Sequence, residues 1–214
     1  MKMKKMKKVI VTCLAGILLM ATVAGCGKFD AAGYVTACLD LLTKGETEQY
    51  MKLTDRTKEQ AEQDYEDNID SMMDGMGEVG LSDELTENYR TLYKDIYKKA
   101  KYTVTGAEKM KDKDGYTVTV EVEQMTGLFD DLENEVTSRV MDEMANLSPD
   151  TTEDELNELV FQTMYDVLQE RMDSISYKDP ETITVEVLGE DGVYSITDDG
   201  YTDLDEALID TAGM

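Results

Sequence analysis

The 214-residue sequence contains no histidine and no tryptophan, and it has only three cysteines and two prolines. Zinc sites, Ser-His catalysis and Cys-His catalysis commonly depend on histidine, so these chemistries lose their usual ligand or base. Enzymes that act on glycans usually line their clefts with aromatic side chains, and the lack of tryptophan weighs against them. The composition therefore excludes most hydrolase mechanisms.

Basic residues are also scarce, and they are unevenly placed. The chain has 21 Lys and Arg against 47 Asp and Glu, a net charge of −26. Five of the lysines lie within the first eight residues, so residues 26–214 hold 16 basic and 47 acidic residues, a net charge of −31. Nucleic-acid binding depends on neutralising phosphates, and a polyanion of this size is not expected to do so. We expect no nucleic-acid partner.

The first 26 residues have the three-part pattern of a secretory signal. A lysine-rich start is followed by an uncharged apolar run from Val9 to Ala24, and small residues precede Cys26. The stretch Val23-Ala24-Gly25-Cys26 resembles the lipobox of bacterial lipoproteins. The alternative is an uncleaved membrane helix, but the run of 16 residues is short for a span, which needs about 20 residues.

The lipobox resemblance implies where the chain is cut and how it is held. In this family the cysteine thiol receives a diacylglyceryl group, a peptidase cleaves before the cysteine, and the new amine often receives a fatty acid such as palmitate. Residues 1–25 would then be the signal peptide, residues 26–28 the lipidated anchor and linker, and residues 29–214 one extracytoplasmic domain. Two acyl chains suffice for stable anchoring. We therefore expect a protein anchored by lipid on Cys26 to the outer face of the cell membrane.

Cysteine usage leaves one thiol in the predicted domain. Cys13 leaves with the signal and Cys26 carries lipid, so Cys38 has no partner for an intramolecular disulfide. Cys38 lies on an apolar helical stripe with Val35 and Leu42. This position predicts a buried small hydrophobic residue.

Helical periodicity dominates the first part of the domain. Asp30 is a suitable N-cap, and Gly45 predicts the end of the first helix. A short helix is expected around residues 50–53, a capping box at Thr57 opens a longer helix, and Ser82 begins the next one.

Two later segments alternate with period two, which predicts β-hairpins. Asp114-Gly115 and Asp191-Gly192 are the turn signals. The expected strands cover residues 102–110 and 116–123, then 182–187 and 194–196. Helices are expected at 128–144, 156–172 and 204–209, with a capping box at Thr152. The sequence thus predicts an α+β fold, with helices packed on an antiparallel sheet of about four strands in two hairpins.

The order of these elements and the ending GVYSITDDGYTDLDEAL look similar to uncharacterised lipoproteins of Gram-positive bacteria, over residues 29–209. Some members of that group carry curved-sheet domains of the cystatin-like or nuclear-transport-factor-like kind. The resemblance implies such a domain here and supplies no catalytic motif.

Two acidic stretches raise the question of a metal site. Asp112, Asp114 and Glu121 match positions of an EF-hand loop, but Met110 stands at the first ligand position, so a hairpin turn is expected instead. The other stretch either holds a hard cation weakly or consists of solvated acids beside a helix capped by Thr202 or Asp203. Its members are Asp198, Asp199, Asp203 and Asp205. We expect no metal and no cofactor.

Lys94, Lys98, Lys99 and Lys101 form a basic island in this acidic chain, with tyrosines between them. They are candidates for contact with an anionic surface or partner. The alternative is that lysines near the end of a helix complement its dipole.

Two functions remain after these exclusions. The first is a surface-tethered, non-catalytic module that binds a protein, an envelope polymer or a small ligand. The alternative is a carboxylate-dependent cell-envelope enzyme such as a glycan hydrolase. With 47 acidic residues, chance carboxylate pairs are unavoidable, so their number does not favour the enzyme.

Overall fold

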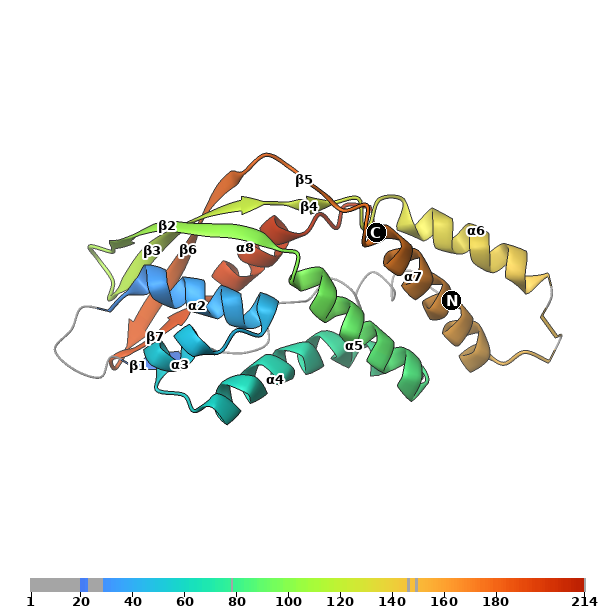
Figure 1. The fold of residues 1–214 in the computed structure, drawn as a ribbon, viewed down its shortest axis with the longest axis horizontal. Coiled ribbons are helices and arrows are strands. Elements are labelled where there is room, and N and C mark those ends of the chain that lie inside the picture. The colour runs from blue at the N-terminus through green and yellow to red at the C-terminus, as the bar shows by residue number, and fades with distance from the viewer. Residues whose placement is uncertain (1–19, 23–28, 78, 146, 149, 214) are drawn as a thin grey trace.

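An antiparallel sheet with helices packed on it forms the body of the molecule (Figure 1). The computed structural model describes residues 20–22, 29–77, 79–145, 147–148 and 150–213. Most of the expected signal peptide, the lipidation residue Cys26 and the linker after it lie outside these ranges. The predictions made for them stay predictions.

Seven helices are present in the described residues, and most begin where the sequence predicts. The side chain of Asp30 accepts the N–H of Gly33 at 2.9 Å, and Gly45 ends that helix with a left-handed φ of 71°. Ser82 and Thr152 are N-caps as expected. The helices are α2 (Ala31–Lys44), α3 (Glu48–Thr54), α4 (Lys58–Gly77), α5 (Asp83–Tyr97), α6 (Leu132–Met144), α7 (Glu153–Arg171) and α8 (Asp198–Leu208).

The main sheet has the strand order β1-β7-β6-β3-β2, and every neighbouring pair is antiparallel. Two hairpins, β2–β3 and β6–β7, are joined in the middle by the pairing of β3 with β6. The α+β prediction and its two hairpins are therefore confirmed. The strands are β1 (Met20–Thr22), β2 (Lys101–Lys109), β3 (Gly115–Glu123), β6 (Glu181–Glu190) and β7 (Val193–Ile196). The cystatin-like curvature stays a prediction.

One face of the sheet is buried and the other is exposed to solvent. Val118, Val120 and Val185 are fully buried, whereas the alternating Glu121 and Thr184 are exposed. Helix α2 packs on β2 and β3, and α8 packs on β6, both over the buried face. This division follows the period-two pattern of the strands.

The last helix starts earlier than expected. Its N-cap is Thr197, whose hydroxyl accepts the N–H of Gly200 at 3.1 Å, so neither Thr202 nor Asp203 caps it. Asp198 and Asp199 occupy the first turn of α8, where acidic residues complement the helix dipole. The prediction of a helix beginning near Leu204 was wrong because the hydroxyl of Thr197 supplied a better cap.

A second, two-stranded sheet was not predicted. It joins β4 (Met125–Thr126) to β5 (Ser176–Tyr177), two residues on each side. Segments this short carry no periodicity, so the sequence contained no signal for them.

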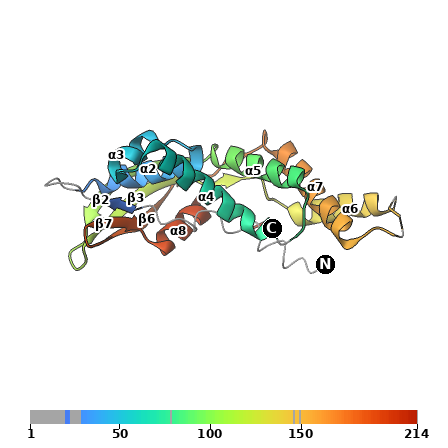
Figure 2. The same ribbon diagram turned by 90° about the horizontal axis from the view of Figure 1, so that it is seen from below.

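Helices α6 and α7 extend from the body as a helical arm (Figure 2). Arg171 lies 2.5 Å from Glu135, and Arg139 lies 2.7 Å from Glu170, so ion pairs link the two helices. Helix α6 begins at Leu132 rather than near Leu128, which is buried in the preceding loop. No helix in the described part of the chain is both long enough and apolar enough to span a membrane.

Candidate functional site

The two ends of the main sheet differ in chemistry. At the end that we call the anchor end, three aromatic rings pack together: Phe29, Tyr116 and Tyr194. The rings of Phe29 and Tyr194 are stacked with their centroids 4.1 Å apart, and Tyr116 lies 5.7 Å from Phe29. Tyr194 also donates its hydroxyl to Asp114 at 3.1 Å. Because Phe29 is three residues after Cys26, this end lies close to the expected lipid anchor.

The anchor end requires a glycine beside the rings. A Cβ atom added at Gly189 would lie 2.7 Å from the ring of Tyr194. Only a residue without a side chain allows this close approach. Glycine and aromatic rings therefore pack closely together at the anchor end.

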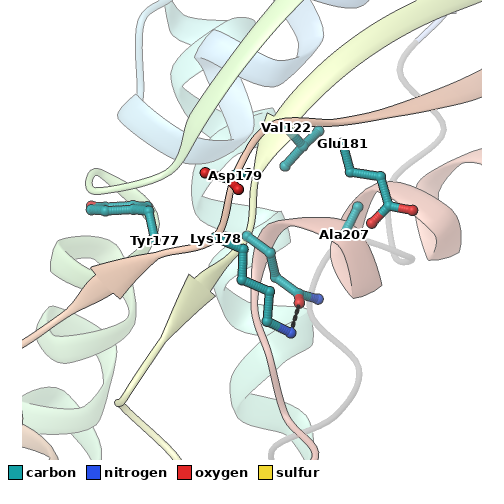
Figure 3. Close-up of a pocket in the computed structure, with 7 residues that line it drawn as sticks. Val122, Tyr177, Lys178, Asp179, Glu181 and Ala207 are labelled. Atoms are coloured by element: carbon teal, nitrogen blue, oxygen red, sulfur yellow. Dashed lines mark hydrogen bonds between the residues drawn. The ribbon is translucent and has the colours of Figure 1, made fainter.

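The opposite end, which we call the recess end, has two open recesses beside the final residues of β3. Strand β3 places Tyr116 at one end and Glu123 at the other, about 23 Å apart at 3.3 Å per residue. The larger recess has a volume of about 560 Å³, and the smaller, of about 300 Å³, lies beside Lys101 and Glu123 (Figure 3 shows the larger). The larger is lined by Val122, Gln124, Tyr177, Lys178, Asp179, Glu181 and Ala207.

Lys178 ties three segments together at the larger recess. Its ammonium group donates to the side chain of Gln124 at 2.6 Å and to Asp210 at 2.7 Å. Gln124 in turn donates to the backbone carbonyl of Glu206 at 2.7 Å. Hydrogen bonds from Lys178 and from the backbone N–H of Ala212 lower the pKa of the Asp210 carboxyl. The end of β3, the β5–β6 connection and the chain after α8 are thus held by charge-assisted bonds.

Tyr177 forms the aromatic part of the same site. Its hydroxyl donates to the backbone carbonyl of Lys99 at 2.8 Å, and the ammonium of Lys101 lies 3.7 Å from the ring centroid. Lys101 also lies 3.4 Å from Glu123. The ring therefore already binds a cation of this chain, which is the chemistry expected for an ammonium over an aromatic face.

Two carboxylates of the larger recess stand apart from these pairs. Asp179 and Glu181 line it, and within the described residues neither makes an ion pair with a basic side chain. Unpaired carboxylates suit a positively charged ligand group. The sequence contains no signal for this recess, because Gln124, Lys178 and Asp210 come together only through the tertiary fold.

The structure places the four lysines of the basic island at the recess end and beside it. Lys94 lies 2.7 Å from Glu66, Lys98 lies 3.3 Å from Asp95, and Lys101 pairs with Glu123 as above. The backbone of Lys99 accepts the hydroxyl of Tyr177. Three of the four ammonium groups thus interact with carboxylates of this chain. Contact with an anionic surface or partner and complementation of the helix dipole both stay predictions.

The remaining candidates are the buried thiol of Cys38 and the acidic residues considered as metal ligands. Cys38 is fully buried, as predicted, and burial raises the pKa of its thiol to about 12, so the reactive thiolate is suppressed. No cluster of three or more possible metal ligands occurs in the described ranges. Glu121 lies within β3 and is paired to β2 and β6, so the EF-hand alternative does not apply.

The fold of this chain is similar to that of a proposed lipoprotein from a Gram-positive bacterium. That protein is ycdA of Bacillus subtilis subsp. subtilis str. 168, a proposed lipoprotein known from a crystal structure. The match has a TM-score of 0.55 and a sequence identity of 22%, and it covers 84% of this chain. At this identity the likeness shows a shared fold.

The chain corresponds to 56% of the ycdA chain, so it spans little more than half of that protein. No protein-family model matches the sequence. No curated protein matches it either.

Proposed function

We propose that this protein is a lipid-anchored, extracytoplasmic binding module that carries out no chemistry of its own. The main support for the proposal is that the expected lipid anchor and the two described recesses lie at opposite ends of the sheet. Phe29, three residues after the expected lipid-bearing Cys26, packs into the aromatic cluster of the anchor end, while the two described recesses lie at the other end. Three linking residues span about 10 Å. The anchor end is thus held at the membrane, and the recess end points away from it.

The charge of the recess supports a cationic ligand or partner. Asp179 and Glu181 supply unpaired carboxylates, and the chain as a whole is strongly acidic. A field of one sign steers an oppositely charged partner toward its site. The shared fold with a proposed lipoprotein agrees with anchoring and leaves the ligand open.

The pKa directions favour binding over the glycan-hydrolase alternative. A glycoside hydrolase needs a carboxyl group whose pKa is raised, so that it can act as a general acid. Glu66 beside Lys94 and Arg90, and Asp210 beside Lys178, have a lowered pKa instead. Basic side chains of the same chain stabilise these carboxylates as anions, which does not suit a general acid.

Photo-cross-linking in intact cells tests the proposal. A photoreactive side chain at Asp179 should form an adduct with a protein or envelope polymer. The additional change Ala207→Tyr, which fills the recess, should abolish that adduct. The matched control Ala107→Tyr, on the exposed edge of β2, should leave it intact.

Two further measurements can overturn the proposal. Mass spectrometry of the membrane fraction should find an acylated peptide that begins at Cys26, and an unmodified Cys26 still joined to residues 1–25 would contradict it. Turnover of peptidoglycan, glycan or ester substrates that is lost on replacing Glu123 or Glu181 would establish the enzyme instead.

A further inference from the structure

The outer edge of β7 already accepts an extended strand in this structure. Residues Met20–Thr22 form β1 and pair with β7 in antiparallel register, with Ala21 opposite Tyr194. Helix α3 lies beside β1 (Figure 1). These three residues precede Cys26, so cleavage at the lipobox removes the strand that covers this edge.

The two outer edges of the hairpin sheet are protected differently. Strand β2 carries Lys101, Glu108 and Lys109, and a bulge interrupts it between Val104 and Gly106. Charges and bulges are the usual devices that prevent a free edge from pairing with another strand. Strand β7 reads Val-Tyr-Ser-Ile, has no charge and has regular pairing with β6. Once β1 is gone, β7 is the edge open to pairing.

The backbone groups of β7 that become free can be identified. Thr197 donates its N–H to the carbonyl of Glu186 at 3.0 Å, toward β6. Backbone groups of successive residues in an antiparallel strand point to alternate sides. The N–H and C=O of Tyr194 therefore point away from β6, toward Ala21 of β1.

Acidic side chains at both ends of β7 define the kind of strand that fits. Glu190 and Asp191 precede it, Asp198 and Asp199 follow it, and all four are exposed. A second copy is disfavoured, because a two-fold pairing of β7 strands would bring the acids at one end beside those at the other end of the partner copy. An extended peptide with an uncharged middle and basic flanks satisfies both the backbone and the charges.

We propose that cleavage before Cys26 uncovers β7, and that this edge then adds an extended partner peptide with an uncharged middle and basic flanks. The proposal rests on the proposed function, because it requires the chain to be processed as a lipoprotein.

Amide hydrogen exchange tests whether the edge is uncovered. The Cys26→Ser chain keeps residues 1–25 and serves as the covered form, and the lipidated chain purified from membranes serves as the mature form. In the mature form the amide of Tyr194 should exchange at least about tenfold faster than in the covered form, because its strand partner is gone. Amides of β2, whose edge is unchanged, provide the internal control.

A peptide titration tests what the edge binds. The probe carries the sequence LMATV between two pairs of lysines, and it should restore slow exchange at Tyr194. N-methylation of its alanine removes the N–H directed at β7 and should weaken binding about tenfold, while N-methylation of its threonine, whose N–H points away, should change it less than about twofold. Replacing the flanking lysines with glutamates should weaken binding about tenfold as well.

Variants of the protein locate the charges. Asp191→Asn combined with Asp199→Asn should weaken peptide binding about threefold, and Glu108→Gln on the other edge should leave it unchanged.

The outcomes separate this inference from the proposed function. A chain that reaches the membrane unlipidated and still joined to residue 1 overturns both. A chain that begins at a lipidated Cys26 but keeps the amide of Tyr194 slow to exchange without peptide overturns this inference alone. Equal binding of the lysine-flanked and glutamate-flanked peptides overturns it too, and so does dimerisation of the mature chain through β7.

Discussion

The two ends of the main sheet are built from the same strands but are held together by different interactions. At the anchor end, Phe29 and Tyr194 stack at 4.1 Å and close the structure by packing. At the recess end, Lys178 and Lys101 hold the chain by charge-assisted contacts, and each lines one of the two open recesses. Apolar packing resists opening more strongly than exposed ion pairs do. The comparison implies that ring packing at the anchor end stabilises the fold more strongly than the ion pairs at the recess end do.

The largest expected effect is at the anchor end. Tyr194→Ala removes a ring that is 7% exposed and stacked on Phe29, so the free energy of unfolding should fall by about 3 kcal/mol. Urea denaturation followed by circular dichroism measures this loss. The control Tyr194→Phe removes only the hydroxyl that donates to Asp114 and should cost about 1 kcal/mol. Equal losses for the two variants would show that ring packing does not close this end.

A smaller effect is expected from the matching tyrosine at the recess end. Tyr177→Leu keeps apolar bulk but removes the hydroxyl bond to Lys99 and the contact with Lys101. The unfolding free energy should fall by about 1–2 kcal/mol in the same urea experiment. A loss as large as that of Tyr194→Ala would mean that the recess end is equally structural.

The contrast also explains what could be read from the sequence. Features set by neighbouring residues were predicted: the caps at Asp30 and Thr152, and the turn at Asp191-Gly192, whose φ values of 53° and 82° match a two-residue hairpin. Asp114-Gly115 marked the first hairpin, although β2 ends at Lys109 and the connecting loop is longer.

Features set by distant residues were missed. Lys178 meets Gln124, 54 residues earlier, and Asp210, 32 residues later. No local pattern records such contacts, so the recess end could not be predicted. The four lysines of the basic island could be recognised in the sequence. The ion pair of Lys94 with Glu66 could not, because it depends on the packing of α4 against α5.

The smallest effect should come from one ion pair at the recess end, and it should depend on pH. The Asp210 pKa is lower in the folded chain than in the unfolded chain, where it is about 3.9. The pair therefore stabilises the fold fully above the unfolded pKa, and this stabilisation is lost as the pH falls through the folded pKa.

Asp210→Asn should accordingly cost about 0.5–1 kcal/mol at pH 7 and nothing once the pH is below the folded pKa. Taking the difference between wild type and variant at each pH removes the general effect of the chain's large negative charge. A difference that stays constant down to the lowest pH would show that the carboxylate charge of Asp210 does not matter.

The orientation of the domain on the membrane tests the account most directly. Spin labels at Glu190→Cys, in the anchor end, and at Lys98→Cys, beside the recess end, can be attached in lipidated protein because the remaining thiol of Cys38 is buried. On anionic vesicles, relaxation by lipid-resident and aqueous reagents reports the depth of each label. The account predicts that Glu190→Cys lies closer to the headgroups than Lys98→Cys. A Lys98→Cys label that lies closer would contradict it and would indicate that the basic island faces the membrane.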